Sequence, residues 1–147
     1  MQVVQATSSD LSAVAELFDA YRQFYNQPAN LSAARNFIAQ RLDAQDSVIF
    51  VVQHDSKLLG FAQLYPSFSS VAMKRMWYLN DLFVSSAERR QGVAGLLLTH
   101  IRHYAKETQA LTVKLATAVD NEQAKALYES HGYVKVTAFD HYTQRVE

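Results

Sequence analysis

Hydrophobic positions in the first third of the chain predict one strand followed by two helices. Val3 and Val4 form a short apolar start, and residues 7–10 (TSSD) then offer side chains that favour a helix N-terminus. Apolar residues recur at the spacing of one helix face, at Leu11, Val14, Leu17, Phe18 and Tyr21. A second helical pattern covers residues 31–42, with Asn30 as its expected N-cap.

The middle of the chain changes to the composition of strands. Residues 47–53 are rich in β-branched side chains, 54–57 (HDSK) read as a turn, and apolar residues resume over 58–66 until Pro66. This order predicts a hairpin. Residues 67–75 then predict a polar connection.

The next segments predict a strand, a helix and a strand. Residues 76–84 (MWYLNDLFV) form a strong strand pattern that the polar residues Asn80 and Asp81 interrupt. A helix face begins near Val93, and residues 111–119 predict the following strand. We therefore expect a parallel pair of strands joined by a right-handed crossover.

The last segments predict a helix and a closing strand or hairpin. Asp120 or Asn121 caps the helix, which runs through Ser130 and ends at Gly132, and residues 133–146 alternate in polarity. No repeat or linker interrupts the chain. We expect a single mixed α/β domain over residues 1–147.

Composition excludes several classes of function. Lys and Arg total 14 and Asp and Glu total 14, so no overall positive field favours nucleic acid or an anionic membrane as partner. The absence of cysteine excludes disulfides, a thiol nucleophile and thiolate metal sites. No signal-like or membrane-spanning segment is evident, so we expect a cytoplasmic protein.

Two of the four glycines, Gly92 and Gly95, lie where the helix near Val93 should begin. The free N–H groups of a helix start can bind a phosphate, and glycine allows close approach. Arg89 and Arg90 precede them and can add positive charge. A tight turn at Gly92 with sheet packing at Gly95 is the alternative. Dinucleotide and Walker-type loops fit worse, because a third glycine and a Gly-Lys-Ser/Thr sequence are missing.

Two motifs resemble those of the Gcn5-related N-acetyltransferase (GNAT) superfamily. The family's pyrophosphate loop, Gln/Arg-x-x-Gly-x-Gly/Ala, is similar to this chain at Arg89, Gly92 and Ala94. A second signature is matched at Asn121, Ala124, Leu127, Tyr128, Gly132 and Tyr133. The resemblance implies a largely antiparallel sheet of about six or seven strands, with a central splayed parallel pair and about four helices.

The resemblance also implies a donor site for acetyl-CoA without a metal. The backbone of Leu82, Phe83 and Val84 is expected to bond the acetyl and pantetheine end. The pyrophosphate is expected at the loop and helix start, formed by Arg89, Arg90, Gln91, Gly92, Val93, Ala94 and Gly95. Asn121, Ala124 and Tyr128 share one helix face and are expected to line the cofactor channel.

Catalysis needs a neutral amine and a proton for the departing thiolate. By the resemblance, Tyr128 is the general acid or a hydrogen-bond donor to the sulfur. The strand YLNDLFV resembles Tyr-Leu-Glu-Asp in diamine acetyltransferases, but Asn80 occupies the Glu position and an amide cannot take a proton. Asp81 is a candidate base only if a bulge or a water redirects it, and a structural carboxylate is an equal alternative.

The acceptor is expected to be a primary amine of a small molecule, such as an amino acid or a polyamine. Tyr21, Phe24 and Tyr25, with Asn80, are the candidate acceptor-binding residues, although the three aromatic residues could equally be core. Protein amines, or acyl-CoA binding without catalysis, remain alternatives. The aromatic tail around Tyr142 is expected to close the acceptor site or to form a dimer contact, and we expect a homodimer.

Overall fold

A computed structural model describes residues 1–147, which divide into two compact units, Met1–Ala116 and Thr117–Glu147. The helices are α1 (Leu11–Phe24), α2 (Leu31–Ala44), α3 (Val93–Glu107) and α4 (Glu122–Ser130), with 3-10 turns η1 (Ser8–Asp10) and η2 (Ser86–Glu88). The strands are β1 (Gln2–Gln5), β2 (Val48–His54), β3 (Lys57–Ser69), β4 (Lys74–Val84) and β5 (Val113–Lys114). The four predicted helices are thereby confirmed.

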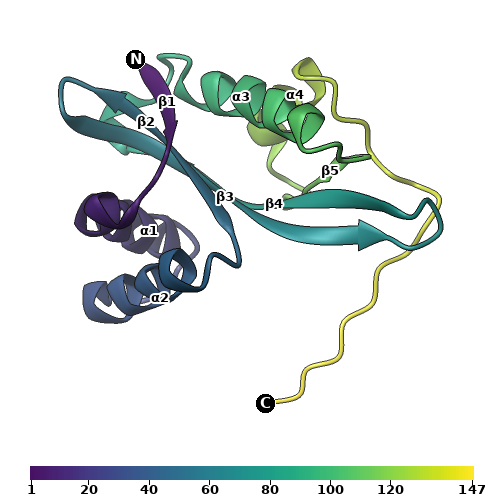
Figure 1. Ribbon diagram of the computed structural model, residues 1–147, viewed down its shortest axis with the longest axis horizontal. Helices are drawn as coiled ribbons and strands as arrows, with labels where there is room; N and C mark the ends of the chain where they lie inside the picture. Colours follow the sequence, from purple (N-terminus) through teal and green to yellow (C-terminus); the bar gives the residue numbers. More distant parts are fainter. The chain divides into compact units, whose positions relative to one another are not determined.

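The first unit is one five-stranded sheet in the order β1-β2-β3-β4-β5. Neighbouring strands are antiparallel except β4 and β5, which are parallel, with Trp77 opposite Val113 and Tyr78 opposite Lys114. The strand, helix, strand crossover through α3 is therefore confirmed. In Figure 1, α1 and α2 cover one face of this sheet and α3 covers the other.

Aromatic and β-branched side chains fill both faces of the sheet. On the face of α1 and α2, the buried residues Ile49, Val51 and Phe61 pack with Val14 and Ile38. On the face of α3, the ring of Phe50 contacts Tyr104 at 5.1 Å between centroids, and Trp77 contacts the same tyrosine at 5.3 Å. Alternation along the strands thus gives two cores rather than one.

Three expectations about strands are wrong. The sheet has five strands and not six or seven, β5 is far shorter than residues 111–119, and residues 133–146 contain no strand. In that last segment Val134 and Val136 are exposed, so their alternation does not mark a buried face. Alternation predicts an extended backbone, whereas a strand also needs a neighbour with which to exchange hydrogen bonds.

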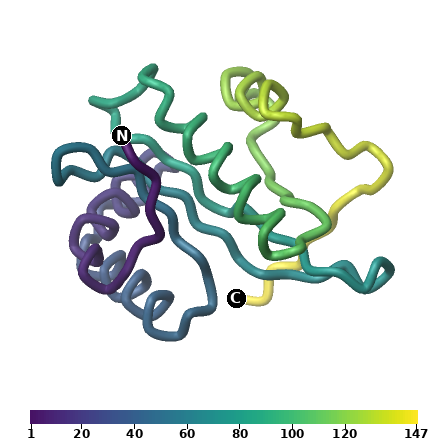
Figure 2. The backbone as a smooth tube through the Cα atoms, turned by 45° about the horizontal axis from the view of Figure 1, so that its top comes forward, coloured from purple at the N-terminus to yellow at the C-terminus, as the bar shows by residue number.

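The connection predicted over residues 67–75 is also wrong. β3 continues through Pro66 to Ser69, and a turn at residues 70–73 leads directly into β4, so the two strands run together to this turn (Figure 2). The pairing of β2 with β3 reaches only Val48 opposite Leu64. Pro66 therefore lies where β3 has a neighbour on one side, and its missing N–H breaks no ladder.

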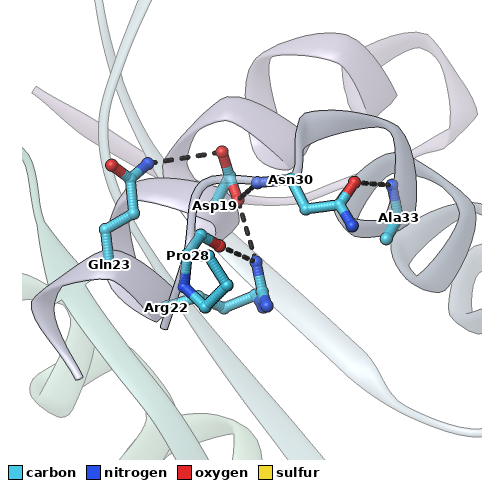
Figure 3. A network of polar contacts seen from close by, with 6 residues as sticks. All are labelled: Asp19, Arg22, Gln23, Pro28, Asn30 and Ala33. Atoms are coloured by element: carbon cyan, nitrogen blue, oxygen red, sulfur yellow. Dashed lines mark hydrogen bonds and ion pairs between the residues drawn. The ribbon is translucent and has the colours of Figure 1, made fainter. Parts of the chain in front are cut away.

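Asp19 joins the end of α1 to the start of α2 (Figure 3). Asp19 is buried, with 7% of its surface exposed. Its carboxylate accepts hydrogen bonds from Arg22 Nη1 at 3.0 Å, from Gln23 Nε2 at 3.3 Å and from the backbone N–H of Asn30 at 3.0 Å. Asn30 in turn caps α2 by accepting from the N–H of Ala33 at 3.1 Å, as its position in the sequence predicts. This network fixes the loop after α1.

Gly60 lies opposite Val84, at a place where the sheet leaves no room for a side chain. A Cβ built on Gly60 would lie 2.8 Å from the backbone oxygen of Phe83 and 3.3 Å from the Cα of Val84. Because the obstructing atoms belong to the backbone, a side chain there must push the two strands apart. The position of the end of β4 beside β3 therefore requires that residue 60 has no side chain.

We expect Gly60→Ala to lower the free energy of unfolding by about 1–3 kcal/mol, the usual cost of overpacking. Denaturant unfolding checks the value, with the exposed substitution Thr99→Ala as a control expected to change it by less than about 0.5 kcal/mol. Hydrogen exchange should become faster at Ser85, whose N–H bonds Leu59 O, but not in α1. Unfolding equal to that of the wild type would contradict the close approach.

We expect Asp19→Ala to cost about 1–3 kcal/mol of stability, because it removes the buried carboxylate and the three hydrogen bonds that this group accepts. The exposed carboxylate of Asp43 provides the control, and Asp43→Ala should change stability by less than about 0.5 kcal/mol. Thermal and denaturant unfolding of both variants measure the difference. Equal effects would show that the Asp19 hydrogen bonds add nothing.

Candidate active site

β4 carries one extra residue at its centre, and this residue is Asn80. Leu79 lies opposite Leu64 and Asp81 lies opposite Gln63, so Asn80 has no partner in the register. A bulge of this kind turns the residues after it to the other face of the strand. Asp81 therefore shares the face of α1 and α2 with Phe83, as the sequence allowed only if a bulge were present.

Asp81 is buried and is held by amide side chains. Its exposed fraction is 4%, and its two carboxylate oxygens accept hydrogen bonds from Asn80 Nδ2 at 3.0 Å and Gln63 Nε2 at 2.8 Å. Gln63 is itself fixed by Ser47, whose Oγ donates to Gln63 Oε1 at 2.8 Å. Asn80 is exposed and lies at the outer end of this chain of hydrogen bonds.

Tyr65 is a second polar group beside Asp81. Burial raises the pKa of Tyr65 to about 12, and the negative charge of Asp81 adds to the increase. Our sequence interpretation missed Gln63, Ser47 and Tyr65. A signal for Gln63 was present, because a single amide interrupts an apolar strand at that position.

The predicted acceptor-binding residues come together beside Asn80. Tyr21 donates its hydroxyl to the backbone oxygen of Asn80 at 3.3 Å, and its ring lies 5.2 Å from that of Tyr25. Phe24 contacts Tyr25 at 5.4 Å. Phe24 and Tyr25 are more than half exposed, at 56% and 51%, so they form a surface and not a core.

Arg89 also contacts this aromatic group. Its guanidinium carbon lies 5.5 Å from the ring centre of Phe24 and 5.6 Å from that of Phe83, and its Nε donates to Val84 O at 3.3 Å. Stacking on aromatic rings is favourable for a guanidinium group. Arg89 thus links the end of β4 to the end of α1.

The loop before α3 has two residues in the left-handed conformation. Arg90 has a φ of +64° and Gly92, the N-cap of α3, has a φ of +81°. No side chain caps the helix, its first turn carries no acidic residue, and a Cβ on Gly92 would meet nothing within 4 Å. The N–H groups of the first turn therefore have no side-chain cap, and the space beside Gly92 is open, which is what anion binding at a helix start requires.

The edge of β4 beside this loop has no strand partner. Pairing with β5 stops at Tyr78, so residues 79–84 have a neighbouring strand only on the β3 side. Ser85 donates its N–H to Leu59 on β3, and hydrogen-bonding direction alternates along a strand. The polar backbone groups of Val84 and Leu82 therefore face the unpaired edge, whereas those of Phe83 face β3.

The second unit contains the other predicted donor-site residues. Asn121 caps α4 by accepting from the N–H of Ala124 at 3.1 Å, and Ala124 and Tyr128 follow on one face of that helix. The ring of Tyr128 lies 5.8 Å from that of Tyr133. Burial raises the pKa of Tyr133 to about 12, with a smaller contribution from Tyr128.

The structure contains neither a metal-binding group of side chains nor a helix that could span a membrane. No group of three or more His, Asp or Glu side chains is arranged to hold a metal ion. None of the helices combines the length and the apolar character that crossing a membrane requires.

The chain matches the family model described as the Acetyltransferase (GNAT) family over residues 14–133, which includes parts of both units. An uncharacterized N-acetyltransferase of Bacillus subtilis (strain 168), YhfO, is 43% identical over 146 residues, which are 99% of this chain and 98% of that protein. A probable acetyltransferase of Haemophilus influenzae is 28% identical, with 90% of each chain covered.

Solved structures agree with this match. The crystal structure of a probable acetyltransferase superimposes with a TM-score of 0.96 at 44% identity and covers 100% of this chain and 99% of that one. The resemblance inferred from the glycine loop and from the Asn121–Tyr133 motif is therefore confirmed. The chain belongs to the GNAT family and is an acetyl-CoA-dependent acetyltransferase.

Proposed function

We propose that the enzyme acetylates a primary amine of a small molecule such as an amino acid or a polyamine. The observation that carries the proposal is the exposed aromatic surface of Phe24 and Tyr25, which Tyr21 connects to the exposed residue Asn80 by a ring contact to Tyr25 and a hydrogen bond to the backbone oxygen of Asn80. Aromatic faces attract the carbon skeleton of an amine, and an amide oxygen accepts its N–H. A small acceptor can make both contacts at once.

The start of α3 fits the pyrophosphate of acetyl-CoA, the acetyl donor of the family. Open space in front of Gly92 and the uncapped first turn of α3 provide backbone donors, as proposed for residues 90–95. Arg90 and Gln91 are exposed beside them and can add side-chain donors. The residues present therefore suit the diphosphate chemically.

The unpaired edge of β4 fits the pantetheine arm. We assign its hydrogen bonds to the backbone groups of Leu82 and the N–H of Val84, because the backbone groups of Phe83 face β3 and the oxygen of Val84 accepts from Arg89. When bound, acetyl-CoA supplies the acetyl group, and its thioester bond breaks as the amide bond to the acceptor nitrogen forms. The chain's own contribution here is to hold the donor in line with the acceptor.

Tyr128 is our proposed general acid for the thiolate, on the match of its motif to the family. The neighbouring Tyr133 is a poor alternative, because its pKa of about 12 lies further from that of a thiol than the pKa of an ordinary phenol does. The role therefore stays with Tyr128. Asn121 and Ala124 remain proposed as donor-site residues by the same match, and the cytoplasmic homodimer likewise remains a proposal.

We expect Gly92→Val to weaken acetyl-CoA binding by at least about 10-fold, because its side chain would occupy the open space at the helix start. Isothermal titration calorimetry measures the dissociation constant. Gly132→Val is the matched control, since Gly132 also has a left-handed φ of +87° and open space where its Cβ would lie. The control should bind within about 2-fold of the wild type. Equal affinity of Gly92→Val would refute the pyrophosphate assignment.

A thiol-release assay with acetyl-CoA and a panel of amines, amino acids and peptides tests the proposed function. We expect saturable turnover with small primary amines and a decrease in kcat of about 100-fold in Tyr128→Phe, the range typical of a lost general acid. Tyr133→Phe should retain at least about half of the activity, because the family motif assigns the role of acid to Tyr128 and burial raises the pKa of Tyr133. Turnover confined to peptides would overturn the proposed acceptor class, and full activity of Tyr128→Phe would remove its role.

A further inference from the structure

In the hydrogen bonds around Asp81, the carboxylate is the acceptor and the neighbouring amides are the donors. An ionised carboxylate accepts hydrogen bonds and donates none, so both amides beside it must turn their NH₂ groups toward it. Gln63 consequently presents Oε1 to Ser47, which donates to it. Each polar atom along this line agrees with its neighbour, which fixes the assignment of amide oxygen and nitrogen.

Asn80, at the exposed end of this chain of hydrogen bonds, is held in the same way. Asn80 directs Nδ2 to Asp81, and its backbone oxygen accepts from Tyr21, so both the side chain and the backbone of the bulge are held. The remaining polar atom, Oδ1, is the acceptor that this exposed residue offers. Asp81, at 4% exposure with both oxygens occupied, has no comparable access to a substrate.

We propose that Asp81 is a positioning residue, which holds Asn80 so that Oδ1 accepts an N–H from the acceptor amine, and that neither residue takes the amine's proton. The inference rests on the proposed amine acetylation. The acceptor enters as the neutral amine, its first proton having passed to solvent water, and the nitrogen lone pair attacks the acetyl carbon. The proton that the nitrogen loses as the amide bond forms also passes to water, and the thiolate that leaves takes up a proton from the proposed general acid. The fraction of neutral amine then governs the rate at low acceptor concentration.

The neighbouring titratable groups in the first unit do not replace a base. Tyr21 contacts Asn80 from α1, and Tyr65 on β3, with its pKa raised to about 12, keeps its proton at neutral pH. Asp46, which follows α2, is paired with Arg41 at 2.8 Å. Acceptors of low pKa are therefore favoured: at pH 7 the neutral fraction of an α-amine with a pKa near 8 is about 200-fold larger than that of a lysine-like amine with a pKa near 10.4.

Steady-state kinetics against pH test the assignment. For the wild type, kcat/KM for the acceptor should rise with pH up to the pKa of the amine used, and this midpoint should move when the acceptor is changed. Asp81→Asn should raise the acceptor KM by about 10-fold, the worth of one hydrogen bond, with kcat within about 3-fold and the same rising limb. Ser47→Ala, at the far end of the chain, should change KM in the same direction but less.

A double-mutant cycle separates positioning from direct contact. If Asp81 acts only through Asn80, the variant Asn80→Leu/Asp81→Asn should have the acceptor KM of Asn80→Leu alone. Additive effects would contradict the proposal. A kcat that falls about 100-fold in Asp81→Asn, together with loss of the rising limb, would instead make Asp81 the base.

Nuclear magnetic resonance of side-chain amides tests the geometry without any substrate. The NH₂ signal that disappears in Asn80→Asp identifies Asn80, and in the wild type its exchange with solvent should be slow for an exposed residue. Ser47→Ala, which keeps Asp81, should make this exchange faster, so the test stands even if Asp81→Asn fails to fold. Fast exchange in the wild type would overturn the positioning role, whereas slow exchange in a protein that acetylates no amine would refute only the proposed function.

Discussion

One extra residue in β4 determines the chemistry of the whole site. Without the bulge at Asn80, alternation would place Asp81 on the face of α3, among aliphatic side chains and without a donor. The bulge moves it opposite Gln63, where two amide groups satisfy its oxygens. It also leaves Asn80 exposed at the boundary between the paired and unpaired parts of β4. A buried carboxylate that would destabilise the sheet without partners is thus stabilised by two hydrogen bonds, and it holds the side chains of Gln63 and Asn80.

The free edge of β4 and the loop before α3 depend on each other. Because β5 pairs with only Trp77 and Tyr78, the backbone of residues 79–84 stays available on one side. The chain then needs a sharp turn to start α3 immediately afterwards, and the left-handed Gly92 provides it without a side chain in the way. Gly60 completes the arrangement from the opposite side of β4, by letting β3 approach closely. In this glycine-poor chain, these two glycines lie on either side of the end of one strand.

The sequence predicted most of the fold and the residue types of the site, for identifiable reasons. Helix starts such as Asn30 and Asn121 are local, since a side chain caps a nearby N–H, and both caps are confirmed. The bulge could not be located from sequence, because it depends on the register between β3 and β4. The pairing of Gln63 with Asp81 depends on the same register, although the isolated amide of Gln63 in an apolar strand was visible in the sequence. Strand number failed where an alternating segment, residues 133–146, gave no information about pairing.

The amide at position 80 changes what the buried carboxylate can do. If a glutamate occupied this position, two carboxylates would lie side by side, and repulsion would raise the pKa of at least one of them. Such a pair is suited to taking a proton. An asparagine instead carries no charge and donates a hydrogen bond to Asp81, so the repulsion is absent. In our proposal the residue at position 80 then cannot take a proton, but it offers a fixed hydrogen-bond acceptor. In the arrangement that we propose, recognition of the amine and removal of its proton are separate tasks, and the residues around the bulge of β4 perform the first.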